Sequence, residues 1–514
     1  MKYFLMLIQL WVGFLSICAS YPKANIWIIP SVESPQVYRN YAQTSKVHLE
    51  MARGEVEHIQ LVFPSKVNEE YRFTFDRNLK GIQISARELK KMNGYYDALV
   101  PFKNQLKCTD TLTAVWITVQ CPSRVPVGKY HQTIKIEGSK HFTIQLDYNV
   151  HHTTIPLKSS IPITVGVENR CVAEGLNDKE ADKERQRWVD FVLSYRMTPV
   201  FGTQITPERW QYEHSFSPWA WNDKRSIRLL NDRRYSCYML PFFTLSENEL
   251  ASLLCNIQKK GKLKESLFYI WDEPAYMEDY EQIKQKVNII RKYASDARIL
   301  TTFFCGPRNG PRKGDLYAVF DYLKHHIHVA TISLAPCKGN EEEVQHIRYK
   351  VPEGIDWWSY VCWQPGGNEP NFLLQMKGIQ QRAIMWRTWK NGSQGFLYWN
   401  CNIYHKRNPF TYITDMPHGD GILIYPGDIL GCKGPIASAR LERWRDGAEE
   451  MELLRLVEKN YSKEKADTLL NIVYSSPLSF IEKAHNIPFF RKELLDQLDK
   501  TIPIDYKLRI TDFI

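Results

Sequence analysis

The residues best suited to chemistry are Asp272 and Glu273, two adjacent acids between the apolar run 267–271 and Pro274. Two carboxyl groups in one pocket separate their proton affinities, so one stays ionised while the other keeps a proton and serves as a general acid. The alternative is an acidic pair at the start of a helix, where Asp and Glu beside Pro are common. The spacing alone leaves both interpretations open.

The sequence around the two acids predicts the end of a strand. The run 267–271 is typical of a strand buried on both faces of a parallel sheet. Pro274 lacks the N–H that a central strand needs, and a helical pattern follows from residue 277. The acids would then lie where α/β barrels and open α/β sheets carry their active sites. Consecutive strand residues point to opposite faces, so the two acids can share a pocket only if the strand ends or bulges there.

Strand and helix patterns alternate from residue 161 onwards and predict a (β/α)8 barrel, with the two acids at the end of its fourth strand. The segment 204–237 breaks the alternation, because it is a long tryptophan-rich loop with little helical pattern. The eight expected strands lie near 162–167, 199–203, 238–243, 267–272, 298–304, 328–333, 355–361 and 395–400. The clearest helical patterns cover 182–195, 247–259, 280–293, 316–325 and 372–389.

Two further regions flank the predicted barrel. Short alternating runs separated by turns before residue 155 predict a β-sandwich. After the last strand, 419–427 is expected to form a hairpin on the barrel rim, and 436–500 to be helical, most strongly amphipathic over 440–457. The predicted organisation is therefore a signal peptide at 1–20, a β-sandwich domain at 21–157, a catalytic (β/α)8 barrel at 158–435 and a helical C-terminal extension at 436–514.

The composition excludes several classes of protein. Of the 514 residues 44% are hydrophobic and 24% charged, which is typical of a soluble globular chain and not of a disordered one. A net charge of +10 without a clustered basic stripe argues against a nucleic-acid partner. The apolar segment 1–20, led by Lys2, is typical of a secretory signal and predicts a periplasmic or extracellular protein; a lipid anchor at Cys18 is the less favoured alternative. No later stretch is apolar and long enough to span a bilayer.

Cysteine and histidine spacings do not indicate a metal site. The cysteines after Cys18 show no paired metal-binding spacing, and Cys108 with Cys121, on either side of a probable strand, is the one candidate disulfide. The histidines at 325, 326 and 328 lack an acidic motif such as H-E-x-x-H and are assigned to a helix end and a strand start. We therefore expect neither a metal nor an organic cofactor.

Six short segments spread along the chain form a more specific pattern. The barrel region contains YIWDEP at 269–274, GFLYWNCN at 395–402, GDGILIYPG at 419–427 and ARLERWRDGAEEMELL at 439–454. The N-terminal region contains ARGEVEHIQLVF at 52–63 and VPVGKY at 125–130. In combination these segments resemble glycoside hydrolase family 123 and the related uncharacterised proteins that share its catalytic domain. The resemblance covers nearly the whole chain after the signal segment and implies a β-sandwich followed by a barrel.

The resemblance also implies a function, that of a retaining, exo-acting β-N-acetylgalactosaminidase whose substrate supplies its own nucleophile, the 2-acetamido oxygen. Asp272 would orient and stabilise the acetamido group, while Glu273 would protonate the leaving oxygen and then activate water. The chain departs from the family pattern at 330–333, where an aspartate-tryptophan strand ending is expected, and at Glu449-Glu450, where Glu-Asp is expected. The first departure leaves the sugar specificity open.

Aromatic residues at strand ends are the natural platforms for a sugar ring in a glycan or glycoconjugate substrate. For each tryptophan, core packing is an equal alternative. Strand alternation predicts that one of Tyr398 and Trp399 faces the barrel centre. Asp420 is a second candidate carboxylate, although a hairpin-turn role is favoured. The expected substrate-binding residues are Trp399, Asn400, Asn402, Tyr398, Tyr360, Trp363 and Trp358.

Two rival functions remain open at this point. A glycosidase for a sugar without an acetamido group could use the same scaffold, but it would need a separate nucleophile on another strand. A glycan-binding protein could have kept the barrel and lost turnover. Fold alone does not decide between them.

Overall fold

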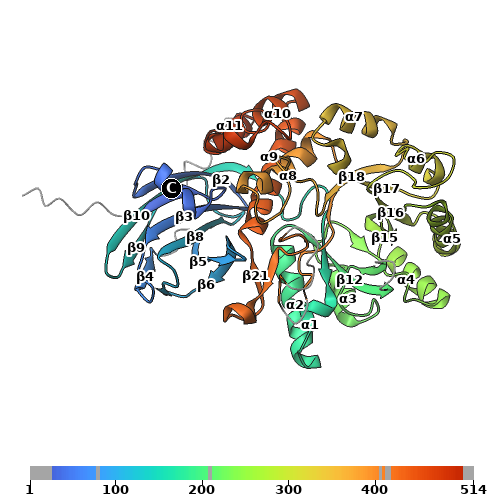
Figure 1. Ribbon diagram of the computed structural model, residues 1–514, viewed down its shortest axis with the longest axis horizontal. Helices are drawn as coiled ribbons and strands as arrows, with labels where there is room; N and C mark the ends of the chain where they lie inside the picture. Colours follow the sequence, from blue (N-terminus) through green and yellow to red (C-terminus); the bar gives the residue numbers. More distant parts are fainter. Residues whose placement is uncertain (1–25, 77–80, 207–210, 405–407, 411–417, 502–514) are drawn as a thin grey trace, which may run out of the picture.

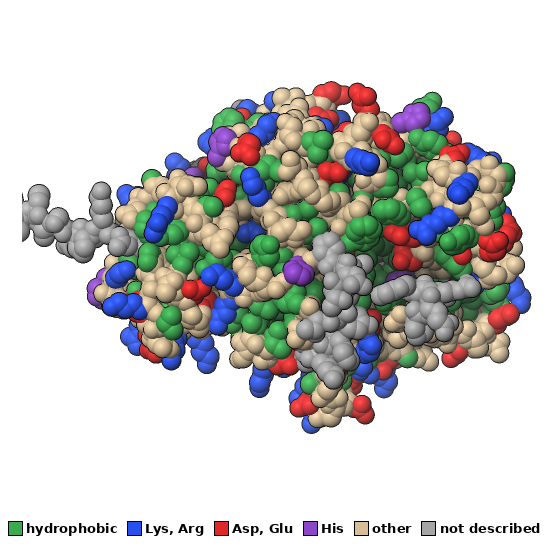
Figure 2. Space-filling view, in the orientation of Figure 1, with side chains coloured by type: hydrophobic (Ala, Val, Ile, Leu, Met, Phe, Trp, Pro, Cys, Tyr) green, Lys and Arg blue, Asp and Glu red, His purple; other side chains and the backbone are tan. Residues whose placement is uncertain are grey.

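The computed structural model describes residues 26–76, 81–206, 211–404, 408–410 and 418–501. The predicted signal peptide at 1–20 lies outside these residues. Within them, no helix is both long and apolar enough to cross a membrane. On the face shown in Figure 2, Lys and Arg side chains lie over both the sheet-rich end and the barrel-like end of the molecule.

The N-terminal part is rich in β-sheet, and two five-stranded sheets enclose an apolar core there (Figure 1). Along β10 (His141–Thr154), for example, every second residue from Phe142 to Val150 faces this core, as the short alternating runs predicted. One sheet has the order β1 (Trp27–Pro30), β3 (Glu55–Pro64), β8 (Leu112–Cys121), β5 (Gln83–Met92) and β6 (Tyr95–Pro101). The other has the order β2 (Lys46–Arg53), β10 (His141–Thr154), β9 (Gly128–Glu137), β4 (Glu70–Phe75) and β7 (Gln105–Lys107).

A nine-stranded, nearly closed barrel-like sheet follows. Eight of its strands run parallel, at the positions that the apolar runs predicted. Their order in the sheet is β12 (Thr198–Thr206), β11 (Ile163–Glu168), β19 (Phe396–Tyr398), β18 (Asp356–Val361), β17 (Val329–Ser333), β16 (Arg298–Phe303), β15 (Ser266–Trp271) and β14 (Tyr238–Met239).

The segment 204–237 is not the long loop that was predicted. It contains a ninth strand, β13 (Gln211–Ser215), which pairs antiparallel with β12, and a short helix, α3 (Lys224–Leu229). Just after β13, the Phe216 N–H donates to the Met239 carbonyl of β14 at 2.6 Å. The antiparallel strand thus lies between the two ends of the parallel sheet, where a regular barrel would pair its second and third strands directly.

Helices cover the outer face of the barrel-like sheet (Figure 1). All five clearest helical patterns are confirmed, with α4 over the whole predicted range. The helices around the sheet, besides α3, are α1 (Asn169–Ala173), α2 (Asp178–Ser194), α4 (Glu247–Lys259), α5 (Met277–Tyr293), α6 (Ala318–Leu323), α7 (Glu341–Lys350) and α8 (Gly378–Lys390). The C-terminal helices are α9 (Ala439–Asn460), α10 (Lys463–Leu470) and α11 (Ile487–Asp499).

Two smaller predictions differ from the structure. The segment 419–427 supplies only the first strand of a hairpin, β20 (Ile424–Pro426), which pairs antiparallel with β21 (Pro435–Ala437), and this hairpin packs against β6 of the N-terminal sheets. Cys108 and Cys121 are both free thiols, as are the other cysteines of the described chain. Cys108 precedes β8 and contacts Thr113 near the start of that strand, whereas Cys121 is its last residue; the ten residues of β8 span about 30 Å, which excludes a disulfide.

Helix α9 lies between the N-terminal sheets and the barrel-like sheet (Figure 1) and is buried on all sides over its first sixteen residues, 439–454. The predicted amphipathic pattern is therefore wrong. Its charged residues are buried because sequence-distant partners neutralise them. The Glu450 carboxylate accepts from Arg382 at 2.5 Å and from Trp386 at 2.8 Å, and Glu449 accepts from the Val56 N–H of β3 at 3.0 Å.

Breaking this buried network should destabilise the fold. In Arg382→Met the Glu450 and Asp446 carboxylates lose their guanidinium partner inside the protein. Removing one partner of a buried ion pair typically lowers the free energy of unfolding by about 3–5 kcal/mol. Denaturant unfolding checks the result. The matched control, Lys292→Met, breaks an exposed pair with Glu247 and should leave the unfolding midpoint unchanged. Equal midpoints for the two variants would contradict the expected result.

Candidate active site

The end of β15 is irregular, and the irregularity turns both acids toward the barrel opening. Tyr269 pairs with Leu300, but Trp271 pairs with the very next residue of β16, so β15 holds one extra residue, a β-bulge. Two residues later Glu273 has φ +45°, a left-handed conformation that costs a non-glycine residue about 1–2 kcal/mol. The strand therefore ends and bulges where the sequence required it to.

The competing helix-start interpretation of the acid pair is wrong. Helix α5 begins at Met277, and the acids of its first turn are Glu278 and Asp279. Asp272 and Glu273 lie before this helix in the loop that follows β15. Both keep exposed surface at the barrel opening.

Asp272 is fixed through one of its two oxygens. Its Oδ1 accepts hydrogen bonds from the Tyr269 hydroxyl and the Thr302 hydroxyl, each at 2.7 Å. The Thr302 oxygen in turn accepts the Glu273 backbone N–H at 3.0 Å, so one side chain of β16 holds both acids. No described residue forms a hydrogen bond with Asp272 Oδ2, which is left available to a ligand.

Glu273 has a different environment. Although it keeps enough open surface to meet a ligand, surrounding protein atoms desolvate its carboxyl group and, with the charge of Asp272, raise its pKa to about 7. The Tyr360 hydroxyl of β18 donates to Glu273 Oε1, and this bond opposes the shift together with the charge of Arg308. Glu273 therefore holds a proton below neutral pH and can give it away near pH 7.

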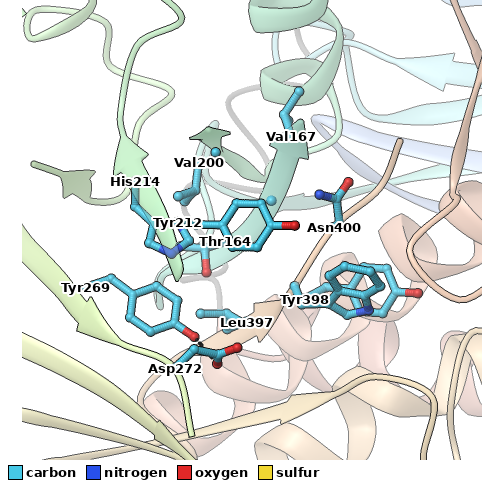
Figure 3. A pocket seen from close by; sticks show the side chains of 13 residues that line it. Thr164, Val167, Val200, Tyr212, His214, Tyr269, Asp272, Leu397, Tyr398 and Asn400 are labelled. Atoms are coloured by element: carbon cyan, nitrogen blue, oxygen red, sulfur yellow. Dashed lines mark hydrogen bonds between the residues drawn. The ribbon is translucent and has the colours of Figure 1, made fainter. Parts of the chain in front are cut away.

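A pocket of about 580 Å³, counting its open mouth, adjoins Asp272 (Figure 3). The His214 ring of β13 stacks on Tyr269 with 4.3 Å between ring centroids, and burial lowers its pKa to about 3, so it is neutral. The pocket is lined by Thr164, Gly166, Val167, Val200, Gly202, Tyr212, His214, Tyr269, Asp272, Leu397, Tyr398, Trp399 and Asn400.

Comparison with known proteins assigns the chain to a family. The family model described as "Glycoside hydrolase 123, catalytic domain" matches residues 183–457, more than half of the chain. The chain belongs to glycoside hydrolase family 123. It is thus a glycoside hydrolase, and the acids at the end of β15 lie within the matched residues. No curated protein matches the chain in sequence.

Solved structures agree with this assignment at the level of the fold. A family 123 glycoside hydrolase from Clostridium perfringens, whose structure was analysed for glycolipid glycan hydrolysis, has a TM-score of 0.63 and 13% identity, covering 95% of this chain and 100% of that one. Two other glycosidases are much less similar. A β-galacturonidase from Eisenbergiella tayi has a TM-score of 0.33 at 9% identity over 77% of this chain and 90% of that one. A β-D-glucuronidase from Dictyoglomus thermophilum has a TM-score of 0.32 at 10% identity over 79% and 71%.

Three of the predicted substrate-binding residues lie at the pocket or at the acid pair of this family 123 chain. Trp399 and Asn400 line the pocket, and Asn400 lies across it from Asp272 (Figure 3). The Asn400 Oδ1 accepts from the Asn402 N–H at 2.9 Å, while no described residue accepts a hydrogen bond from its Nδ2, which leaves that group to a ligand. Tyr360 faces the barrel interior and reaches Glu273. Of the pair that strand alternation left open, Trp399 is thus the residue directed inward.

Three other predicted residues cannot contact a substrate directly, because they are buried. Tyr398 borders the pocket, but its ring is fully buried against Phe372, with 4.9 Å between the ring centroids. Trp358 fills the barrel interior below the pocket, over Gly395. Asn402 holds the end of β11 by accepting the Glu168 N–H and donating to the Glu168 carbonyl. Trp363 is exposed but lies outside the pocket lining.

Several groups that position the site were not predicted from the sequence. Tyr269 and Thr302 lie on inward positions of β15 and β16, and this alternation was the available signal. His214 comes from the strand that was not predicted. Asp420 is not a mere turn residue: its Oδ1 accepts from Trp399 Nε1 at 3.0 Å and from the Tyr398 hydroxyl at 3.1 Å. Burial raises the pKa of Asp420 to about 6.

Tyr360→Phe should move the pH dependence of catalysis. The Tyr360 hydroxyl stabilises the ionised form of Glu273, so its removal raises the pKa of that acid. The pH at which kcat/KM falls on the alkaline side should therefore increase. A pH–rate profile measures it, with Tyr349→Phe on the exposed face of α7 as the control. An unchanged or lower alkaline midpoint would contradict this assignment.

Proposed function

We propose that this family 123 enzyme is a retaining, exo-acting β-N-acetylgalactosaminidase that uses the 2-acetamido group of its substrate as the nucleophile. The observation that supports this proposal most directly is that the two adjacent acids have different environments. Asp272 is anchored through Oδ1 beside the pocket, while Glu273 has a pKa of about 7 and hydrogen-bonds to a different strand. Adjacent residues with such different environments suit two distinct roles.

In the first step the sugar occupies the pocket, with its acetamido N–H toward Asp272 Oδ2. The acetamido carbonyl oxygen attacks the anomeric carbon, the glycosidic C–O bond breaks, and Glu273 transfers its proton to the departing oxygen. The product is a bicyclic oxazolinium ion, which keeps the N–H of the acetamido group and whose positive charge the Asp272 carboxylate stabilises. In the second step Glu273 takes a proton from water, which attacks the anomeric carbon and reopens the ring. Two inversions give retention.

The burial of Asp420, a third acid near the pocket, favours the substrate-assisted mechanism over one in which the protein supplies the nucleophile. A conventional retaining enzyme needs a second carboxylate about 5–5.5 Å from the acid, across the sugar. Asp420 is the candidate, but it is 3% exposed and its Oδ1 is bound to Trp399 and Tyr398. Asp420 thus holds the tryptophan that lines the sugar pocket and is not open to the anomeric carbon.

The proposal also covers the fold, the domain boundaries and the export of the protein. The barrel-like sheet is a (β/α)8 barrel in which β13 stands between the second and third strands, and the N-terminal sheets form a β-sandwich. The chain divides near residues 157 and 435 into the sandwich, the barrel and the helical extension. The segment 1–20 directs export to the periplasm or the cell exterior.

Hydrolysis of paired aryl β-glycosides tests the proposed function. The wild-type enzyme should cleave the N-acetylgalactosaminide and leave the galactoside essentially intact, because the galactoside has no acetamido oxygen. Comparable cleavage of the galactoside would indicate a different sugar specificity and a separate nucleophile. No cleavage of either, together with binding of N-acetylgalactosamine, would favour a glycan-binding protein.

A further inference from the structure

An exposed aromatic pair follows the two strands, β16 and β18, whose side chains hold the acid pair. Trp363 is 41% exposed, unusually open for a tryptophan, and Phe304 beside it is half-buried. Their rings are nearly parallel, with an interplanar angle of 16° and 6.3 Å between centroids. Together they present apolar ring surface, of which Trp363 is the more open part.

The position of this pair relates it to Glu273. Phe304 directly follows β16, whose Thr302 holds both acids, and Trp363 follows β18, whose Tyr360 bonds Glu273. The carboxyl ends of these parallel strands meet at one edge of the sheet. Asp272 lines the sugar pocket, whereas Glu273 is not among its described lining residues and is directed to β18.

The proton donor must face the leaving oxygen, so the part of the substrate beyond the cleaved bond extends on the Glu273 side. That direction leads from the sugar pocket, past the Tyr360–Glu273 hydrogen bond, to the surface of Phe304 and Trp363. The flat apolar face of a pyranose packs well on such rings. A leaving group that is itself a sugar would lie there.

A basic side chain lies in the same segment as Phe304, after β16. Arg308 is exposed, its backbone N–H donates to the Ala275 carbonyl at 2.6 Å, and its charge acts on Glu273. No described carboxylate forms an ion pair with Arg308. The acids of the adjacent first turn of α5 are engaged elsewhere: Glu278 accepts from Asn309 at 3.3 Å, and Asp279 accepts the Ala275 and Tyr276 N–H groups at 2.8 and 2.9 Å. The Arg308 guanidinium hydrogen-bonds to the side chains of Tyr276 and Cys305, neither of which is a carboxylate, so its charge is left to pair with an anionic ligand group.

We infer that Phe304, Trp363 and Arg308 form a leaving-group subsite that binds a second pyranose carrying an anionic substituent, a carboxylate or a sulfate ester. The inference rests on the proposed function, because it takes Glu273 as the proton donor. Binding energy from this second sugar would contribute to transition-state stabilisation, so kcat/KM should depend on the sugar that leaves.

Three substrates isolate the subsite: methyl β-N-acetylgalactosaminide, which has no second ring, and two disaccharides in which N-acetylgalactosamine is β-linked to glucose or to glucuronic acid. For the wild type, kcat/KM should increase in that order. Trp363→Ala should lower the ratio of glucose disaccharide to methyl glycoside about tenfold. Arg308→Gln should lower the ratio of glucuronic acid to glucose disaccharide about tenfold, and Arg308→Lys should restore part of it. Tyr349→Ala, an exposed tyrosine on α7, is the control and should change neither ratio.

Unchanged ratios in Trp363→Ala and Arg308→Gln would overturn the subsite, as would an equal loss on all three substrates, which indicates a structural effect. Failure of the wild type to cleave any of them would instead overturn the proposed function. In that case, binding of methyl β-glucuronide is measured by saturation-transfer NMR. Binding to the wild type that is lost in both Trp363→Ala and Arg308→Gln would still support the anionic sugar site, and no binding to the wild type would overturn it.

Discussion

Glu273→Gln should lower kcat/KM for an alkyl or disaccharide β-N-acetylgalactosaminide by about 10²–10⁴-fold, the usual contribution of a positioned general acid. Glutamine keeps the shape of the side chain and its contact with Tyr360 but has no proton to transfer to the leaving oxygen. The loss should shrink for a dinitrophenyl glycoside, whose leaving group needs little protonation. An equal loss on both leaving groups would argue that Glu273 acts in some other way.

The pH profile provides a second check on the same residue. Glu273 must be protonated for the first step, and its pKa is raised to about 7, so wild-type kcat/KM should be full below this value and fall as the pH rises through it. In Glu273→Gln this alkaline decrease should disappear. A variant that retains the decrease would assign the titration to another group.

Asp272→Asn should lower kcat/KM on acetamido substrates by about 10²–10³-fold, comparable to the loss of one transition-state electrostatic contact. Tyr269 and Thr302 both donate to the inner oxygen, so the amide keeps its oxygen there and presents its NH2 group to the substrate. It can then neither accept the acetamido N–H nor balance the positive charge of the forming oxazolinium ion. The variant also loses the negative charge that raises the pKa of Glu273. Its alkaline limb should therefore move to lower pH, opposite to the shift expected for Tyr360→Phe.

Thermal unfolding controls for the integrity of Asp272→Asn, since its Oδ1 is bound by Tyr269 and Thr302. An unchanged unfolding temperature with the expected loss of activity would support the electrostatic role. A nearly active Asp272→Asn would contradict it, and the nucleophile would have to be sought on another strand.

The parallel strands and the acid pair could be predicted because their signals are local. The run 267–271 is apolar on both faces and is followed by Pro274, a pattern typical of a buried parallel strand that ends there. Strand β13 has no such signal: Gln211–Ser215 is short, polar and antiparallel, and its pairing depends on β12. With it His214 was missed.

Burial depth and long-range pairing could not be predicted from one sequence. Alternation showed that only one of Tyr398 and Trp399 faces inward, but it does not tell how far down the barrel a residue such as Trp358 lies. For α9, the spacing of charges suggested a solvent-exposed face. The partners that bury those charges, Arg382 and Val56 among them, come from elements 60 to 400 residues away in sequence.

The most direct test of substrate assistance uses aryl β-galactosaminides whose acetamido methyl carries none, one, two or three fluorine atoms. Fluorine withdraws electrons from the carbonyl oxygen that we propose as the nucleophile and leaves the leaving group unchanged. If the acetamido oxygen is the nucleophile, the wild-type kcat/KM should fall steeply with each added fluorine, by several orders of magnitude over the series. A flat dependence would contradict substrate assistance and require a nucleophile from the protein.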